Sequence, residues 1–251
     1  MRILLLSDIH SNLEALQACL AAAPAHDAVV NLGDIVGYGA NPNEVTQKAR
    51  ELGGTFVRGN HDKVVAGIDS AETFNPIAAI AALWNREQLT DENLDWVRAL
   101  PKGPVPAQQL PGIQFVHGAP DDEDRYVVTV EDSAASFAAS TEPVTFFGHT
   151  HIQCAFTLRS GRIDDTIPEY ATIGKPETWE FRLDSGSNYL INPGSVGQPR
   201  DGDWRAAFAV FDSERLIVTF CRVPYELRSA QEKIFAANLP ARLATRLAAG
   251  R

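Results

Sequence analysis

The sequence has few of the features that would place it in several common protein classes. Its 251 residues include only three cysteines, Cys19, Cys154 and Cys221, whose spacing gives neither a disulfide framework nor a CxxC zinc motif. We interpret them as buried thiols in a reducing compartment. No apolar run approaches the roughly 18 residues that span a bilayer. The N-terminal run meets Asp8 before a signal-peptide core could form. These absences predict a cytoplasmic protein without membrane contact.

An excess of basic residues is also lacking. The chain carries 22 Lys and Arg against 32 Asp and Glu, a formal net charge of −10. Because a nucleic-acid surface needs clustered Lys and Arg to neutralise phosphates, we expect no stable nucleic-acid binding. A small anionic substrate remains compatible with an acidic chain, since bound dications reverse the local charge of a site.

The first third of the chain alternates strand-like and helix-like segments. Residues 2–7, 27–34 and 55–60 read as strands, and residues 12–23 and 41–52 read as helices. The second helix has start signals: Asn41 as cap, Pro42 at its first position and Glu44 three residues after the cap. Strands and helices in such short alternating units predict a parallel sheet with helices on its faces.

Later segments change the pattern. Residues 72–100 read as two helices inserted over one edge of the sheet, and residues 113–120 and 144–151 as strands separated by a helix near 131–139. From Cys154 onward, hairpin-like strands follow at 154–158, 178–183, 188–192, 206–212 and 215–223. A closing helix near 225–247 is interrupted by Pro240. We predict an α/β fold (α+β in some schemes) with a single domain, residues 1–251, built as a two-layered mixed β-sandwich flanked by helices.

Five short motifs carry the chemistry. Each follows an apolar strand and begins a loop: SDIH at 7–10, GD at 33–34, RGNHD at 58–62, VHG at 116–118 and GHTH at 148–151. Five of the six histidines lie in these motifs. In α/β sheets, ligands bind beyond the carboxyl ends of strands. Any one motif alone is more simply a polar strand end or a turn, but their shared placement predicts one metal site.

The ligand types indicate which metals suit the site. Carboxylate oxygen and imidazole nitrogen without thiolate favour Mn, Fe, Zn, Ni or Co over a structural zinc. Seven candidate side chains exceed the need of one ion, so we expect two divalent ions with a bridging carboxylate.

The order D-x-H, GD, GNHD, H, GHTH resembles the calcineurin-like metallophosphoesterase superfamily, and most closely its small bacterial and archaeal phosphoesterases. The segment INPGSVGQPRDGD at 191–203 is similar to one that this subgroup carries near its C-terminus. The resemblance implies a four-layer α/β/β/α architecture and a phosphomonoesterase or phosphodiesterase that uses a hydroxide held between two ions, with manganese the first expectation.

Carried over position by position, the resemblance implies a set of roles. One metal is held by Asp8, His10 and His151, the other by Asn60, His117 and His149, with Asp34 bridging the two. His61 matches the family's catalytic histidine and is expected to protonate the leaving group; Asn60 and His61 both face substrate. Arg58 and Asp62 are expected to grip phosphate or to orient His61, although a surface ion pair explains them equally well.

One stretch departs from the serine/threonine phosphatase branch of that superfamily. Where that branch has an Asp and an Arg after its GD motif, this sequence has Gly37 and Tyr38. A phosphoprotein substrate is therefore not expected, and a small phosphate ester is. Tyr38 is a candidate hydrogen-bond donor to substrate or a packed tyrosine. Arg200 and nearby backbone N–H groups are candidates to bind phosphate, or the segment is a plain turn.

Two other functions fit parts of the sequence. An amidohydrolase-type barrel also pairs histidines, but its H-x-H comes early in the chain and here comes last. A binding scaffold on the same fold, without catalysis, would be expected to lack ligands or the histidine after Asn60, and none is missing. Leu239, Leu243 and Leu247 form a stripe that packs either on the protein's own core or on a second subunit. A homodimer and a monomer are therefore both compatible with the sequence.

Overall fold

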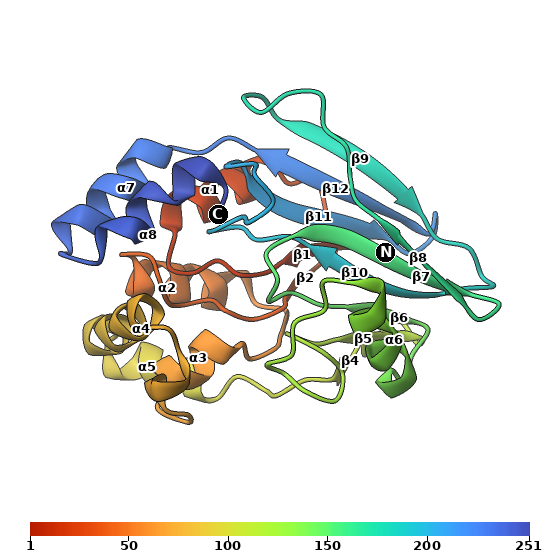
Figure 1. The fold of residues 1–251 in the computed structure, drawn as a ribbon, viewed down its shortest axis with the longest axis horizontal. Coiled ribbons are helices and arrows are strands. Elements are labelled where there is room, and N and C mark those ends of the chain that lie inside the picture. Colours follow the sequence, from red (N-terminus) through yellow and green to blue (C-terminus); the bar gives the residue numbers. More distant parts are fainter.

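Two six-stranded sheets lie face to face at the centre of the protein (Figure 1). The structure is a computed structural model and describes residues 1–251. The first sheet has the order β3-β2-β1-β11-β12-β9 and the second β4-β5-β6-β10-β7-β8. The strands are β1 (Arg2–Leu6), β2 (Ala28–Asn31), β3 (Thr55–Phe56), β4 (Val105–Pro106), β5 (Ile113–Phe115), β6 (Val144–Phe146), β7 (Gln153–Arg159), β8 (Arg162–Thr166), β9 (Glu177–Arg182), β10 (Asn188–Pro193), β11 (Ala206–Asp212) and β12 (Ile217–Val223).

Helices cover the outer faces of both sheets. They are α1 (Leu13–Ala22), α2 (Pro42–Leu52), α3 (Asn60–Val65), α4 (Pro76–Gln88), α5 (Asp91–Arg98), α6 (Val130–Ala139), α7 (Leu227–Ala236) and α8 (Ala241–Thr245), with 3₁₀ turns at Ala71–Thr73 and Leu247–Ala249. Helix α1 begins where Asn12 Oδ1 accepts a hydrogen bond from Ala15 N at 3.1 Å. Helix α2 ends at Gly53, whose φ of +63° few other residues adopt.

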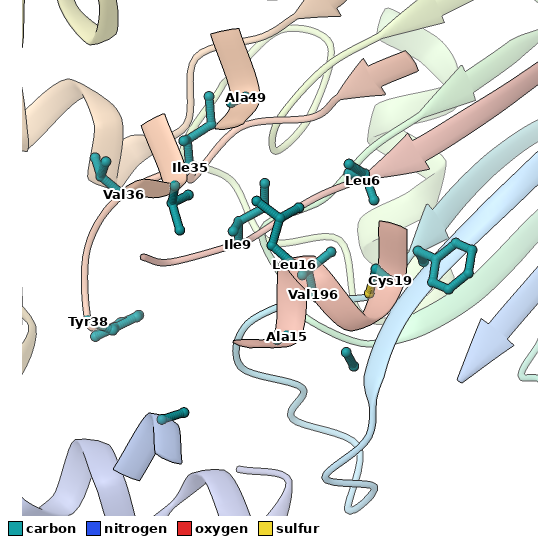
Figure 2. Packing of buried hydrophobic residues seen from close by; sticks show 14 of the residues in the cluster. Leu6, Ile9, Ala15, Leu16, Cys19, Ile35, Val36, Tyr38, Ala49 and Val196 are labelled. Carbon is teal, nitrogen blue, oxygen red and sulfur yellow. The ribbon is translucent and has the colours of Figure 1, made fainter. Parts of the chain in front are cut away.

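Three hydrophobic clusters bind the layers together. Side chains such as Ile3, Phe146 and Phe211 fill the space between the sheets. The outer face of the first sheet packs on α1, α2, α7 and α8 through Leu6, Leu16 and their neighbours (Figure 2). A smaller cluster joins Phe137 of α6 to the outer face of the second sheet. The layers therefore run helix, sheet, sheet, helix, which confirms the predicted α/β/β/α architecture.

Several predicted elements have different bounds in the structure. The strand expected at 55–60 stops at Phe56, because α3 begins at Asn60 within the RGNHD motif that reads as a loop. Asp62 Oδ2 accepts a hydrogen bond from Gly59 N at 3.0 Å and so satisfies the first turn of α3. Strand β8 is missing from the sequence prediction because its residues are polar and its position is at a sheet edge.

The helical insertion lies where the sequence places it, beside edge strand β3. The ring of Trp96 contacts that of Phe56, with centroids 5.2 Å apart. Trp84 and Trp96 are partly buried against the core beneath them. At the N-terminus of α2, Asn41 occupies the cap position, but its side chain donates to Glu44 Oε1 at 3.1 Å instead of accepting a backbone hydrogen bond.

The C-terminal helix predicted at 225–247 is two helices, α7 and α8, separated by Pro240. Leu239, Leu243 and Leu247 are all buried in the cluster beneath the first sheet's helices, so the leucine stripe packs on the protein's own core. No helix of the structure combines the length and the apolar character needed to cross a bilayer.

Replacing Leu243 by Ala should lower the free energy of unfolding by about 2–5 kcal/mol, because Leu243 is fully buried and its truncation leaves a cavity. The matched change of Leu83, which is 47% exposed on α4, should cost less than about 1 kcal/mol. Urea unfolding of both variants measures the difference. Equal losses would contradict the docking of the C-terminal segment on the core.

Candidate metal centre

Six parallel strand ends meet at one edge of the sandwich. Strands β1, β2 and β3 are parallel in the first sheet, and β5, β6 and β10 are parallel in the second. All five sequence motifs follow these strands. Hydrogen bonds join the loops across the sheets: His149 N donates to Asp8 Oδ2 at 3.1 Å, and Val196 N donates to Ser7 O at 2.9 Å. Distant motifs therefore converge as the sequence predicts.

Four imidazole rings are oriented by backbone carbonyl groups. One ring nitrogen of each lies within hydrogen-bond distance of a carbonyl oxygen: His10 Nδ1 to Val36 O (3.2 Å), His151 Nδ1 to Gln198 O (2.6 Å), His117 Nδ1 to Leu32 O (2.8 Å) and His149 Nε2 to Asp124 O (3.0 Å). A carbonyl only accepts, so each of these nitrogens carries a proton. In the neutral form of each ring the other nitrogen presents a lone pair.

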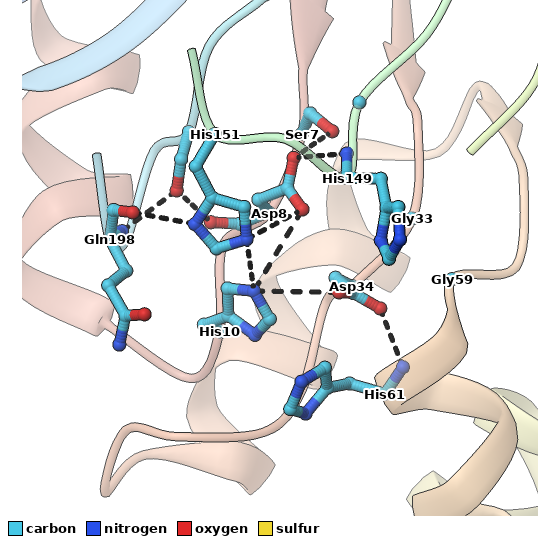
Figure 3. A network of polar contacts seen from close by, with 12 residues as sticks. Ser7, Asp8, His10, Gly33, Asp34, Gly59, His61, His149, His151 and Gln198 are labelled. Atoms are coloured by element: carbon cyan, nitrogen blue, oxygen red, sulfur yellow. Dashed lines mark hydrogen bonds and ion pairs between the residues drawn. The ribbon is translucent and has the colours of Figure 1, made fainter. Parts of the chain in front are cut away.

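The free nitrogens face one another in two pairs. His10 Nε2 and His151 Nε2 are 3.1 Å apart (Figure 3). His117 Nε2 and His149 Nδ1 are also 3.1 Å apart. Two lone pairs at this distance repel unless a proton or a cation lies beside them. Donor nitrogens fixed from behind by carbonyl groups are the usual arrangement of histidines that bind metals.

Two buried carboxylates complete the two groups. Asp8 Oδ1 lies 3.2 Å from His151 Nε2 yet accepts no hydrogen bond. Asp34 Oδ2 lies 3.5 Å from His10 Nε2 and 3.5 Å from His117 Nε2, and therefore stands between the pairs. The potential ligands form two sets that share Asp34: one of Asp8, His10, Asp34 and His151, the other of Asp34, His117 and His149. Asn60 Oδ1 lies 3.2 Å from His117 Nε2, beside the second set.

Burial controls the charge of these groups. Burial lowers the pKa of His149 to about 3 and also lowers the pKa of His10 and His151. For His117 burial acts in the same direction, but the Asp34 carboxylate outweighs it and raises the pKa to about 10. A dication beside Asp34 would take the place of that proton. With dications in place of that proton, the site would consist of neutral imidazoles around two carboxylates.

The backbone at the site is strained. Asp8, His10, Asp34, His149 and His151 all have φ between +49° and +67°, a region that residues with a side chain rarely adopt. Such strain persists where surrounding structure fixes it and is concentrated at functional sites. Only three of the ten non-glycine residues with positive φ, Ser160, Leu216 and Asn238, lie away from these loops.

His61 lies apart from the ligand sets and lines an adjoining cleft of about 300 Å³. Its ring contacts those of Tyr38 and Phe74, with centroids 4.3 and 4.5 Å away. Nδ1 is buried without a partner against Gly37, which leaves Nε2 as the nitrogen able to face the cleft. Burial lowers the pKa of His61 to about 4. Phe74 belongs to the start of the helical insertion, so the insertion forms one wall of the cleft. Its tryptophans, Trp84 and Trp96, do not line the cleft.

Arg58 forms an ion pair, the alternative expected for it, and Asp62 binds backbone N–H groups. Arg58 donates two hydrogen bonds to Glu123 at 3.0 and 3.1 Å and does not contact the His61 ring. The Asp62 carboxylate accepts hydrogen bonds from Asp34 N, Val36 N and Gly59 N at 2.8, 3.1 and 3.0 Å. Burial and the charge of Asp34 raise its pKa to about 7. Asp62 thus holds the loop that carries Asp34, whereas neither residue orients the histidine.

The segment after β10 supports the site from behind. Its backbone N–H groups at Val196, Gly197 and Arg200 donate to Ser7 O, Asp8 O and His151 O, so they are not free to bind phosphate as one sequence interpretation proposed. The carbonyl of Gln198 orients His151. Arg200 itself projects to Tyr38, whose hydroxyl lies 3.3 Å from Nη2. The two candidate substrate-binding residues are therefore neighbours.

Some site residues were missed from the sequence. Asn85 of α4 is fully buried, accepts hydrogen bonds from Ser11 Oγ and Gly37 N at 2.6 and 3.0 Å, and ties the helical insertion to the first loop. An amide directly after the apolar run of α4 was the available signal. Tyr126 lies in the acidic loop at 121–126, and its ring centroid is 3.9 Å from that of His149. No sequence pattern indicated that Tyr126 belongs to the site.

Comparison with known proteins identifies the family. The sequence model of the calcineurin-like phosphoesterase superfamily domain matches residues 1–215. The chain belongs to this superfamily. Within it, the chain is 36% identical to an uncharacterized protein of Methanocaldococcus jannaschii, over 99% of this chain and 98% of the relative.

Solved structures agree with this chain in fold. A metallophosphoesterase from Sphaerobacter thermophilus is 39% identical and superimposes with a TM-score of 0.84, covering 100% of this calcineurin-like chain and 99% of the other. A hypothetical protein from Pyrococcus horikoshii OT3 gives a TM-score of 0.77 at 19% identity, with 100% and 98% coverage, and supports the fold alone. The predicted family and fold class are confirmed.

Replacing Gly59 by Ala should disrupt the centre, because a Cβ atom there would lie 2.1 Å from Asp34 Oδ1 and 2.3 Å from Asp34 N. Displacing Asp34 should weaken divalent-metal binding by about 10- to 100-fold, the usual effect of disturbing groups that orient ligands. Isothermal titration with Mn²⁺ measures this affinity. Gly174→Ala is the control, since nothing lies within 4 Å of its added Cβ. Unchanged Mn²⁺ affinity in Gly59→Ala would refute the packing of Asp34 against Gly59.

Proposed function

We propose that this calcineurin-like protein is a phosphoesterase that uses two divalent transition-metal ions, Mn²⁺ first among Mn, Fe, Zn, Ni and Co. Its expected substrate is a small phosphomonoester or phosphodiester. The observation that carries the proposal is the pairing of imidazole nitrogens at 3.1 Å, each ring fixed by a carbonyl group, on both sides of Asp34.

The residues present fit two ions. Asp8, His10 and His151 would hold one, and Asn60, His117 and His149 the other, with Asp34 shared. Nitrogen and oxygen donors without thiolate suit the metals named. When bound, such ions stabilise charge on a phosphoryl group and make a nucleophile available at neutral pH. Asp62 acts as a positioning residue, because its three backbone hydrogen bonds fix the Asp34 loop.

His61 is the candidate proton donor to the leaving group. It borders the cleft, and its Nε2 makes no hydrogen bond within the protein, so that nitrogen can carry a proton to an ester oxygen. The ring is held by its contacts with Tyr38 and Phe74. An anionic ester in the cleft favours the protonated ring that this role requires.

The cleft restricts the substrate to modest size. A volume of about 300 Å³ accommodates a small ester, in the range of small-molecule sites. Lys63 at its rim is already paired with Asp124 at 2.5 Å and Asp69 at 3.3 Å. We therefore do not expect a broad electrostatic grip on a phosphoprotein or a nucleic acid.

Replacing Asp34 by Asn should remove activity and metal together, because the shared carboxylate contacts both ligand sets. Mn-loaded protein is assayed on bis-p-nitrophenyl phosphate, with metal content measured by mass spectrometry. Asp165→Asn, at an exposed carboxylate on β8, is the matched control and should change neither. Two retained ions and full activity in Asp34→Asn would contradict the bridging role. Absence of hydrolysis by the Mn-loaded unmodified protein would favour the binding scaffold.

Replacing His61 by Ala should leave metal content nearly unchanged while kcat falls about a hundredfold or more on alkyl esters, which have poor leaving groups. Much of the loss should be recovered with p-nitrophenyl esters, since p-nitrophenolate leaves without a proton. His26→Ala, outside the site, is the control. Loss of a metal ion in His61→Ala, with no recovery on the activated ester, would instead make His61 a ligand.

A further inference from the structure

Two arginines from distant segments converge on Tyr38 beside the candidate metal centre. The guanidinium carbon of Arg200 lies 5.8 Å from the Tyr38 ring centroid, and that of Arg246 lies 6.0 Å from it. The same ring contacts His10 and His61, with centroids 4.6 and 4.3 Å away. Tyr38 therefore connects the arginine pair to the ligand set that contains His10 and to the proposed proton donor, His61.

Neither arginine is paired with an acidic side chain. No Asp or Glu oxygen lies within 4.0 Å of either guanidinium, although the protein carries 32 acidic residues. Arg200 Nη2 donates to Tyr38 and to Gln198 Oε1, while its Nε is buried and without a partner. The guanidinium of Arg246 bonds only through Nε, to the main-chain oxygen of Arg251, the last residue of the sequence, so its Nη1 and Nη2 remain unpaired. Most of the donors of this pair are thus unused.

The two guanidinium carbons each lie within 6.0 Å of the Tyr38 ring centroid, and their positive charges act on each other. Burial and the nearby charge of Arg200 both lower the pKa of Arg246. Like charges placed together without a counterion destabilise the folded protein by themselves. An anion between them would remove this repulsion, and a phosphate accepts the paired N–H groups of guanidinium in a fixed geometry.

Arg246 is held at this position by the docking of the C-terminal segment. Leu243 and Leu247 on either side of it are buried in the core. Gly250 packs against Gly202 and Asp203, and Gly202 N donates to Gly250 O at 3.0 Å. The loop at 194–203 that carries Arg200 is therefore braced by the segment that carries Arg246. The two positive charges are fixed relative to each other.

We propose that Arg246, together with Arg200 and Tyr38, forms a subsite for a second anionic group of the substrate, a phosphate that is bound but not hydrolysed. This inference rests on the proposed phosphoesterase function, since it places the scissile phosphate at the adjoining metal centre. It gives the C-terminal segment a role in selecting substrates with two phosphate groups over those with one.

Two p-nitrophenyl esters that differ by one phosphate test the subsite in the Mn-loaded protein. They are thymidine 5′-(p-nitrophenyl phosphate) and the same compound with a 3′-phosphate. The unmodified protein should have the higher kcat/KM on the second. Arg246→Gln should lower kcat/KM on the second by at least about tenfold, and on the first by less than about threefold. Arg246→Lys, which keeps the charge without the forked donors, should show an intermediate loss.

Arg242→Gln is the matched control. Arg242 lies on the same segment one turn earlier and is exposed, so its loss changes the net charge equally without touching the subsite. It should leave both esters unchanged. No preference for the second phosphate in the unmodified protein, or an equal loss on both esters in Arg246→Gln, overturns the inference. If Arg246→Gln does not fold, Arg246→Lys provides the same comparison.

A binding measurement separates this inference from the proposed function. Calorimetry compares methylenebisphosphonate with methylphosphonate, neither of which can be hydrolysed at a P–O–P bond. The second phosphonate group should strengthen binding to the unmodified protein, and Arg246→Gln should reduce that gain at least about tenfold. If no ester is hydrolysed but this gain depends on Arg246, the phosphoesterase proposal fails and the subsite stands. If the second phosphonate group strengthens binding equally in the unmodified protein and in Arg246→Gln, the subsite proposal is wrong, whatever the result with the esters.

Discussion

Orientation of four buried imidazoles by backbone carbonyl groups is the constraint on which the rest of the site depends. Each carbonyl fixes a proton on the outward nitrogen and so directs a lone pair inward. Val36 and Leu32 supply two of these carbonyls from the loop after β2, and Gln198 supplies another from the loop after β10. The ligand geometry is thus built by the ends of strands in both sheets.

This arrangement is unfavourable to the folded protein unless a cation is present. It buries two carboxylates, places ring nitrogens against each other and holds five site residues at positive φ. Uncompensated buried charge and backbone strain of this kind each cost free energy. The stabilisation must come from elsewhere, and the three hydrophobic clusters around the two sheets are the evident source. A rigid sandwich allows strained loops at its edge.

The sequence was sufficient for the fold class and for the convergence of the motifs. Apolar runs ending in Asp8, Asp34, His117 and the GHTH pair follow a rule about strand ends that does not depend on side-chain packing. Strand β8 and helix α3 could not be predicted from the sequence. Strand β8 has no apolar pattern, and helix α3 begins inside a motif that is typical of a turn. Helices and strands were predicted best where a periodic pattern of apolar residues extended over many residues.

The hydrogen-bond and ion-pair partners of individual side chains could not be predicted from the sequence. Arg58 and Asp62 flank His61 in the chain, yet Arg58 turns to Glu123 and Asp62 turns to the backbone of the Asp34 loop. Arg246 is 46 residues from Arg200 in the chain, yet both guanidinium carbons lie within 6.0 Å of the Tyr38 ring centroid, because the C-terminal segment packs on the core. Such contacts depend on tertiary packing, which periodicity does not encode.

Anomalous X-ray diffraction from a crystal of the Mn-loaded protein tests the central claim most directly. We predict two manganese peaks about 3.5–4 Å apart, one among Asp8, His10 and His151 and one beside His117 and His149, with the Asp34 carboxylate between them. Manganese bound only away from Asp34, or inward imidazole nitrogens that remain 3.1 Å apart with no metal beside them at saturating Mn²⁺, would contradict the account.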